Sequence, residues 1–238
     1  MVAPRSYFAP YRWQDMQLPE QVKDDLDDIP KLGLTNSRSG LNGIAEHPDN
    51  QQRMWAAYYA TITFMDEQVG RIMTELDRLG LRESTAVVFT SDHGYHLGDH
   101  SFWQKNNVHE QVTRVPMILS APGFKPGRSA SIVELVDLYP TLSELAGFKA
   151  PVAAQGLSLL PLLSDPAATV KTGAISFAKG RGTSWRTRDW AYMRYKDGTE
   201  EFYDMRRDPG QITNQAKNPE YRGTLKKLAA GLAARLAD

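Results

Sequence analysis

The chain has 238 residues, of which 41% are hydrophobic and 10% aromatic, which is enough for a core of ordinary size. Its 28 Lys and Arg residues balance its 28 Asp and Glu residues. This balance excludes the clustered positive excess that binders of nucleic acid or anionic membranes need, so we expect no nucleic-acid partner. The absence of cysteine excludes disulfides and thiolate metal sites. No apolar run approaches the roughly 20 residues of a membrane span, and none is expected.

The first half of the chain predicts an α/β arrangement. Residues 1–50 are irregular and rich in proline, and they do not form a signal peptide, so the compartment stays open. Over 51–79, apolar side chains recur at three- and four-residue spacing, which predicts a long amphipathic helix ending near Gly80. The β-branched and apolar run at 85–90 predicts a buried strand. A helix followed by a buried strand is the unit of a doubly wound α/β sheet.

The second half of the chain has a different sequence pattern, with shorter predicted elements. A further strand is predicted at 115–120 and a further helix at 134–147, with Pro140 near the start of that helix. Short alternating segments then follow at 174–177, 183–188, 191–195 and 200–205, and the Asp-Gly turn at 197–198 is typical of a hairpin. A final amphipathic helix is predicted over 219–236. These patterns predict a small antiparallel sheet closed by one helix.

The stretch after the 85–90 strand concentrates chemically active side chains. Asp92 and His93 are followed by Gly94, which lets the backbone turn so that both side chains face one point. Ligand sites gather at the carboxyl ends of strands in open α/β sheets, and Asp oxygen and neutral His nitrogen are metal ligands. One Asp-His pair is usually a cap or a surface hydrogen bond. Three His and two Asp within nine residues favour a site.

Several motifs follow one another in this region: Thr-Ser-Asp-His-Gly at 90–94, Leu-Gly-Asp-His at 97–100, Trp103, Lys105 and Arg-Val-Pro-Met-Ile at 114–118. Together they closely resemble the sulfatase family of the alkaline-phosphatase superfamily. The His directly after Asp92 and the His-Leu-Gly-Asp-His run at 96–100 look most like its iduronate-2-sulfatase-like branch. Further similarity covers 3–8, 136–142, 155–159, 185–187 and 201–210, in the family's order. The resemblance implies an alkaline-phosphatase-like α/β sandwich, here partial, over 1–165. It implies a small C-terminal antiparallel sheet subdomain packed by a helix over 166–238.

The resemblance also implies a chemistry, the hydrolysis of sulfate monoesters. Sulfatases use a formylglycine nucleophile and a Ca²⁺ ion held by carboxylates and an Asn or His. By this likeness Asp92 and His93 are metal ligands, and Lys105 reaches the sulfate and the leaving oxygen. The expected substrate is a sulfated sugar or an aryl sulfate.

Other polar residues have weaker support. His96 and His100 either line the substrate pocket or satisfy loop hydrogen bonds, and the two interpretations have equal weight. Trp103 is expected to pack over the metal loop, and Glu110 and Arg114 to pair structurally. Two histidines without supporting context, His47 and His109, are expected at the surface. In the C-terminal subdomain, surface or packing roles are favoured over recognition of an anionic substrate for three residues, Arg181, Trp185 and Arg186.

The match to the family also has gaps. No Cys-x-Pro-x-Arg or Ser-x-Pro-x-Arg motif occurs, and no segment matches the one that carries the paired aspartates of the family's metal shell. The acidic run at 24–28 lacks the alternating ligands and glycine of a calcium loop and is expected to be a solvated turn. Two ligands do not build the six-to-eight-oxygen shell of Ca²⁺. We therefore expect the chain alone to be inactive and to need an N-terminal sulfatase half. Two alternatives stay open: a phosphonate monoester or phosphodiester hydrolase of the same superfamily, and a non-catalytic fragment retained as a binding module.

Overall fold

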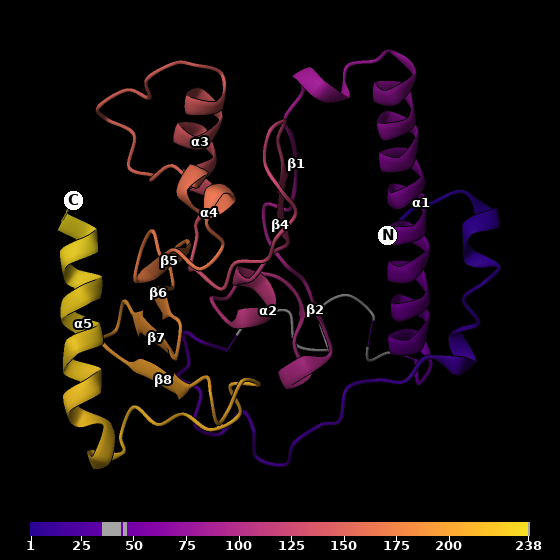
Figure 1. Ribbon diagram of the computed structural model, residues 1–238. Helices are drawn as coiled ribbons and strands as arrows, with labels where there is room; N and C mark the ends of the chain where they lie inside the picture. The colour runs from indigo at the N-terminus through magenta and orange to yellow at the C-terminus, as the bar shows by residue number, and fades with distance from the viewer. Residues whose placement is uncertain (35–43, 45–46, 238) are drawn as a thin grey trace. The chain divides into compact units, whose positions relative to one another are not determined.

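The computed structural model describes residues 1–34, 44 and 47–237, which form two compact units (Figure 1). The first unit comprises 1–23, the described part of 35–85, and 95–105; the second comprises 24–34, 86–94 and the described residues from 106 onward. In the described part of the chain, no helix combines the length and the apolar character needed to cross a membrane. The predicted domain division at residue 165 stays a prediction.

The first unit is organised around one long helix. The predicted helix is confirmed as α1 (Asn50–Arg78), and Gly80 follows it at φ +67°, where a residue without Cβ is favoured. Short 3-10 turns occur at η1 (Arg5–Phe8), η2 (Trp13–Asp15), η3 (Arg82–Ser84) and η4 (Asp99–Ser101). A two-stranded ladder pairs β2 (His96–Leu97) with β3 (Trp103–Gln104). Trp103 is buried in a cluster with Leu97 and Ile44. It therefore packs in a core, and its predicted place over the metal loop stays a prediction.

The second unit begins with a strand pair that differs in part from expectation. β1 (Val87–Thr90) and β4 (Met117–Ser120) pair antiparallel, with Val88 opposite Leu119. The strands are placed as predicted, but β1 is half-buried along its whole length rather than buried. The physical reason is that β4 is the single strand hydrogen-bonded to β1 among the described residues. The α/β fold class is confirmed.

Helices and a meander complete the second unit. The helix predicted over 134–147 is a 3-10 turn, η5 (Leu135–Asp137), continued by α3 (Leu138–Leu145), with Pro140 in the first turn of α3. After α4 (Leu160–Ser164), four antiparallel strands follow in chain order: β5 (Gly173–Ala178), β6 (Gly182–Thr187), β7 (Trp190–Tyr195) and β8 (Glu200–Asp204). The 3-10 turn η6 (Pro219–Tyr221) then leads into α5 (Arg222–Ala237).

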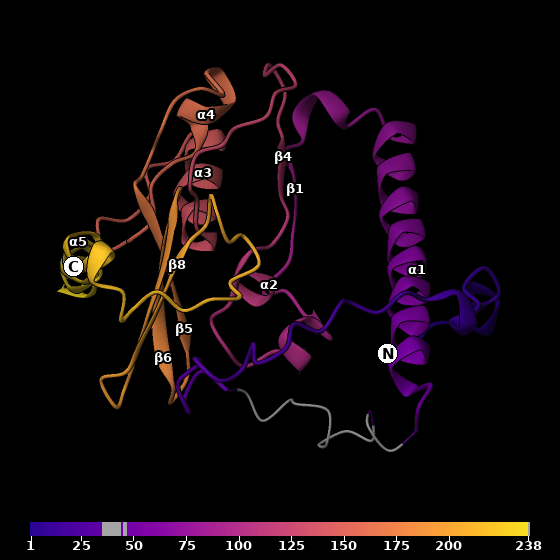
Figure 2. The ribbon, with the colours of Figure 1, turned by 90° about the horizontal axis from the view of Figure 1, so that it is seen from below.

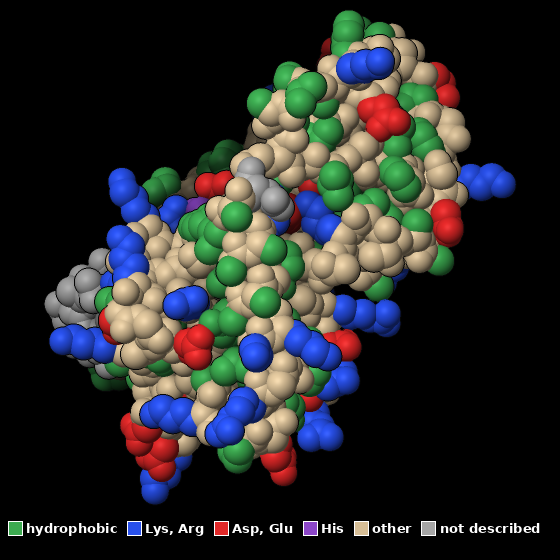
Figure 3. All heavy atoms as spheres, turned by 90° about the vertical axis from the view of Figure 1, so that its left-hand side faces the viewer, with side chains coloured by type: hydrophobic (Ala, Val, Ile, Leu, Met, Phe, Trp, Pro, Cys, Tyr) green, Lys and Arg blue, Asp and Glu red, His purple; other side chains and the backbone are tan. Residues whose placement is uncertain are grey.

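The four-stranded sheet is covered on both faces because its side chains alternate between two clusters. α5 packs along one face, where Leu228 and Leu232 contact Tyr192 and Phe202 (Figures 1 and 2). The other face carries Met193, Tyr195 and Tyr203, with Val108 packed among them. The predicted small sheet closed by a helix is confirmed. On the side of the molecule that carries α5, basic and acidic side chains are interspersed (Figure 3).

Candidate active site

Asp92 and His93 follow β1 directly and lie side by side. Asp92 Oδ2 is 3.5 Å from His93 Nε2, and the Asp92 side chain is 84% exposed. Asp92 Oδ1 accepts the His93 backbone N–H at 3.0 Å, and Ser91 Oγ donates to the His93 carbonyl at 2.8 Å. These local hydrogen bonds shape the turn so that a carboxylate and an imidazole face the same point.

The His93 ring is oriented by its other nitrogen. Nδ1 lies 2.8 Å from the carbonyl oxygen of Gly94, which can only accept, so Nδ1 carries the hydrogen and the lone pair of the neutral ring is on Nε2. This is the usual arrangement of a metal-ligating histidine, whose second nitrogen is fixed by a carbonyl. Two ligands at roughly 2.4 Å from one ion and about a right angle apart lie near 3.4 Å from each other. The 3.5 Å separation of Asp92 and His93 therefore fits a shared cation.

Gly94 is required by a close backbone approach. Its N–H donates to the carbonyl of Val112 at 2.7 Å, and a Cβ on Gly94 would lie 2.0 Å from the carbonyl oxygen of Gln111. Val112 and Gln111 both belong to α2 (Glu110–Thr113). The glycine expected to let the chain turn away thus serves a different steric purpose, since it lets α2 press against the Asp92–His93 turn.

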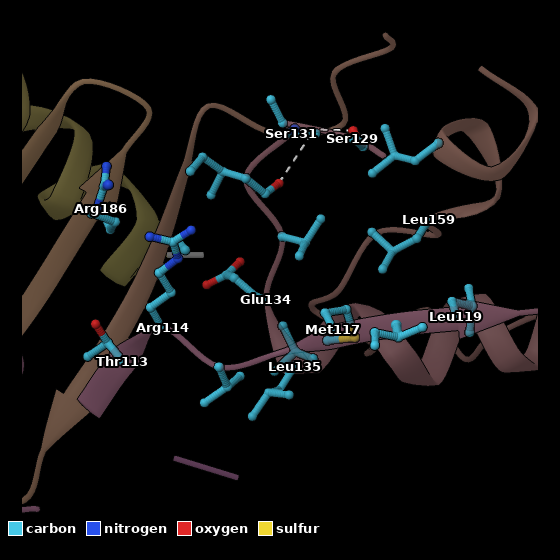
Figure 4. A pocket seen from close by; sticks show the side chains of 18 of the residues that line it. Thr113, Arg114, Met117, Leu119, Ser129, Ser131, Glu134, Leu135, Leu159 and Arg186 are labelled. Atoms are coloured by element: carbon cyan, nitrogen blue, oxygen red, sulfur yellow. Dashed lines mark hydrogen bonds between the residues drawn. The ribbon is translucent and has the colours of Figure 1, made fainter. Parts of the chain in front are cut away.

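Asp92 and His93 line a large hollow of the second unit, with a volume of about 1510 Å³. Its walls come from β4, the 124–136 loop, α4 and β5. Figure 4 shows the side chains of Arg114 and Glu134 directed into it, beside apolar side chains that include Met117 and Leu159. The lining of the hollow therefore mixes apolar side chains with many polar and charged ones, including Arg114, Arg128 and Arg186.

Lys105 is an exposed residue at the end of the first unit. Its neighbours Gln104 and Asn106 have positive φ values of 70° and 107°, and His100 and Ser101 have values of 55° and 54°. Residues other than glycine adopt this region at an energetic cost, and such residues cluster at functional sites. The strained backbone therefore marks 100–106 as a segment held in a special conformation.

His96 and His100 belong to a buried aromatic group. His96 is 0% and His100 5% exposed, and the His96 ring lies 5.3 Å from Phe102 and 6.5 Å from His100, between ring centroids. This places both rings in the interior of the first unit, where they pack against each other. Their roles toward a substrate stay predictions. Asp92 and His93 belong to the second unit, while His96, His100 and Lys105 belong to the first.

The expectation that His109 lies at the surface is wrong, whereas His47 is exposed as predicted. His109 is fully buried, and its Nε2 donates to Glu201 Oε2 at 2.9 Å. Tyr203 donates to the same oxygen and Tyr195 to Oε1, each at 2.5 Å. Burial would raise the pKa of Glu201, but the His109 ring and the two hydroxyls hold that pKa below its ordinary value.

Sequence reasoning missed this group because His109 stands in a polar loop with no local signal. The sequence signal for a buried ionic group was Glu201, a glutamate within a predicted strand of the small sheet.

The arginines of this region have structural partners. Arg186 Nε lies 2.8 Å from Glu110 Oε2, whereas the predicted Arg114–Glu110 pair is longer, at 3.8 Å, with Arg114 80% exposed. Arg181 donates to the carbonyls of Leu32 and Leu34, and Trp185 is buried against α5. The favoured packing roles of Arg181, Trp185 and Arg186 thus agree with the contacts observed.

Within the described ranges, no group of three or more His, Asp or Glu residues is placed to hold a metal ion. The fit to a cation accordingly rests on the Asp92–His93 pair, which supplies one oxygen and one nitrogen. The remaining ligands of a complete shell would have to come from elsewhere.

Two family models match this chain. One, described as Sulfatase, matches residues 7–148, and the other, described as N-sulphoglucosamine sulphohydrolase, C-terminal, matches residues 98–238. Each covers more than half of the chain. The chain therefore belongs to the sulfatase family.

Individual proteins agree with this assignment. A sulfatase of Formosa agariphila is 30% identical over 234 residues, covering 97% of this chain and 46% of that protein. A solved structure in complex with its substrate D-glucosamine-2-N,6-O-disulfate is 30% identical with a TM-score of 0.73, covering 78% of this chain and 40% of its own. A phosphonate monoester hydrolase from Silicibacter pomeroyi shares the fold at 24% identity, with a TM-score of 0.84 and coverage of 98% and 52%. The chain spans about half or less of the length of the curated relatives it matches.

Proposed function

We propose that this chain is a portion of a Ca²⁺-dependent sulfuric ester hydrolase, contributing Asp92 and His93 as metal ligands. The observation that carries the proposal is the Asp92–His93 pair, two ligand atoms 3.5 Å apart with the imidazole fixed through Nδ1, in a member of the sulfatase family. When bound, the cation polarises the sulfate oxygens and offsets the charge that develops on them.

Lys105 acts at the leaving group in this proposal. Its ammonium donates hydrogen bonds to the sulfate and to the ester oxygen, and it can supply the proton that the departing alkoxide needs. Its exposure and the strained backbone around it support a role outside packing. In the same proposal, His96 and His100 either hold the shape of this segment or contact the substrate.

The nucleophile is proposed to lie outside these 238 residues. Neither formylglycine motif occurs in them, so the chain by itself is expected to be inactive. An N-terminal sulfatase half carrying the formylglycine and further carboxylates would complete the site, whether in one longer polypeptide or as a separate partner.

The proposed substrate is a sulfated sugar or an aryl sulfate. The relative solved with a disulfated glucosamine supports the sugar class. The His directly after Asp92 and the His-Leu-Gly-Asp-His run at 96–100 support a place in the iduronate-2-sulfatase-like branch.

A second candidate is phosphonate monoester hydrolysis. It is favoured by the likeness to two such hydrolases, one at 24% identity and one at 25%. A phosphonate and a sulfate ester present similar tetrahedral oxyanions to a cation and a lysine, so the groups of this chain serve both.

The test combines this chain with a sulfatase segment that carries a modified Cys-x-Pro-x-Arg motif. Sulfate release from an aryl sulfate and from disulfated glucosamine is measured with Ca²⁺ and with chelator, and an aryl phosphonate monoester is assayed in parallel. We expect Ca²⁺-dependent sulfate release by the combination and none by the chain alone. Preferred turnover of the phosphonate would favour the second candidate. Stable association without turnover of either ester would favour a non-catalytic binding module.

A further inference from the structure

One short segment of the second unit, residues 107–113, contacts both the four-stranded sheet and the Asp92–His93 turn. On the sheet side, His109 donates to Glu201 of β8 at 2.9 Å, and both side chains are 0% exposed. With Tyr195 and Tyr203 also donating, the Glu201 carboxylate accepts three hydrogen bonds. A buried carboxylate satisfied in this way has a single favourable arrangement, because any displaced donor leaves charge unpaired in the core.

Two further contacts tie the same segment to the C-terminal part of the unit. Arg186 of β6 pairs with the Glu110 carboxylate at 2.8 Å. The side chain of Gln211, which is 1% exposed, accepts the Glu110 backbone N–H at 2.8 Å. The start of α2 is thus fixed by the Glu110 backbone N–H and by the side chains of His109 and Glu110.

On the other side, α2 holds the Asp92–His93 turn. The His109 carbonyl accepts the N–H groups of Val112 and Thr113, each at 3.0 Å, so the position of His109 sets that of the whole turn. Val112 in turn accepts the Gly94 N–H at 2.7 Å. The Gly94 carbonyl receives the His93 Nδ1 hydrogen at 2.8 Å. A continuous run of short contacts therefore connects Glu201 to the His93 ring.

We propose that Glu201 is a positioning residue, which fixes the orientation of Asp92 and His93 through His109 and α2. In this proposal the C-terminal sheet holds Asp92 and His93 in place without contacting a substrate. What that pair binds rests on the proposed function, but the positioning itself does not.

Amide hydrogen exchange measured by NMR on the 238-residue chain tests the proposal directly. The reporter is the Gly94 N–H, which is protected by Val112. In Glu201→Gln, we expect exchange at Gly94 to rise at least about tenfold, because a hydrogen bond to a charged group is lost where water cannot replace it.

The matched control is Lys171→Met, which breaks another buried ion pair of the same unit. Its reporter is the Leu157 N–H, which donates to Asp137 at 2.8 Å. Each rate is compared with that of the slowest-exchanging amides of the same variant, which report global unfolding. On this scale, we expect Lys171→Met to speed exchange at Leu157 but not at Gly94, and Glu201→Gln to do the reverse. Tyr203→Phe, which removes one hydrogen bond to the Glu201 carboxylate and keeps its charge, should speed Gly94 exchange as well and provides the test if Glu201→Gln does not fold.

Unchanged exchange at Gly94 in a folded Glu201→Gln or Tyr203→Phe chain would overturn the proposal, as would equal acceleration of both reporters in every variant. The result is separable from the proposed function because exchange requires neither metal nor turnover. Faster Gly94 exchange in a chain that fails to build a Ca²⁺ site with its complementing half would keep the positioning and reject the metal site. Unchanged exchange beside an intact Ca²⁺ site would do the opposite.

Discussion

Lys171 Nζ lies 2.6 Å from Asp137 Oδ1, and the Asp137 side chain is 0% exposed. The same ammonium lies 2.6 Å from Glu134 Oε2. The two carboxylates also accept the backbone N–H groups of Leu157 and Ile175. One lysine therefore joins the start of β5 to the helical segment that begins at η5, in an almost dry site. A second positive charge comes from Arg235, whose Nη2 lies 3.9 Å from Glu134 Oε2.

We expect Lys171→Met to be strongly destabilising. It leaves two buried carboxylates without their ammonium, and breaking a buried pair from one side costs about 3–5 kcal/mol. Urea unfolding of the 238-residue chain followed by circular dichroism measures the loss. The control is Arg78→Met, which removes an exposed pair with Glu75 and should leave the midpoint unchanged. Equal effects of the two substitutions would contradict the assigned burial.

The Glu201 group predicts a pH dependence of stability. The pKa of Glu201 is held below its ordinary value in the folded chain, so the folded state binds the proton less readily than the unfolded state. The resulting stabilisation is fully present above the ordinary glutamate pKa of about 4.3 and is lost as the pH falls through the lower folded value. Urea midpoints measured from pH 7 to pH 3 should fall less steeply in Glu201→Gln. Parallel curves for the two proteins would show that this carboxylate does not contribute.

Gly94→Ala and Gly70→Ala are two matched substitutions that test the close backbone contact at Gly94. A Cβ on Gly94 would lie 2.0 Å from a backbone oxygen of α2, whereas one on Gly70, inside α1, meets nothing within 4 Å. We expect Gly94→Ala to destabilise the chain, since neither backbone can yield without losing its hydrogen bond. Gly70→Ala should stabilise it by about 0.5–1 kcal/mol through helix propensity. Thermal unfolding of both variants checks this, and a stabilised Gly94→Ala would contradict the close approach.

Asp92→Asn and Lys105→Met separate the metal role from the leaving-group role. In the complemented enzyme, Asp92→Asn should raise the Ca²⁺ concentration needed for half-maximal activity, because an amide oxygen is a weaker ligand than a carboxylate. Lys105→Met should lower kcat by about 10²-fold or more without changing that concentration. Both side chains are exposed, so thermal unfolding of the chain alone should stay as in the parent. Identical Ca²⁺ titrations for Asp92→Asn and the parent would remove Asp92 from the ligand set.

Local patterns in the sequence predict most elements of secondary structure correctly. Helical periodicity placed α1 to within one residue at each end, and alternation placed the four strands of the small sheet, because these patterns depend on which faces of local segments avoid water. The sequence also identified the family, since the Asp92–His93–Gly94 run is contiguous. Only the tertiary structure paired His109 with Glu201, 92 residues apart, and set Gly94 against α2. Neither contact produces a periodic pattern in the sequence, because a buried ion pair and a close backbone contact depend on which distant segments meet in the fold.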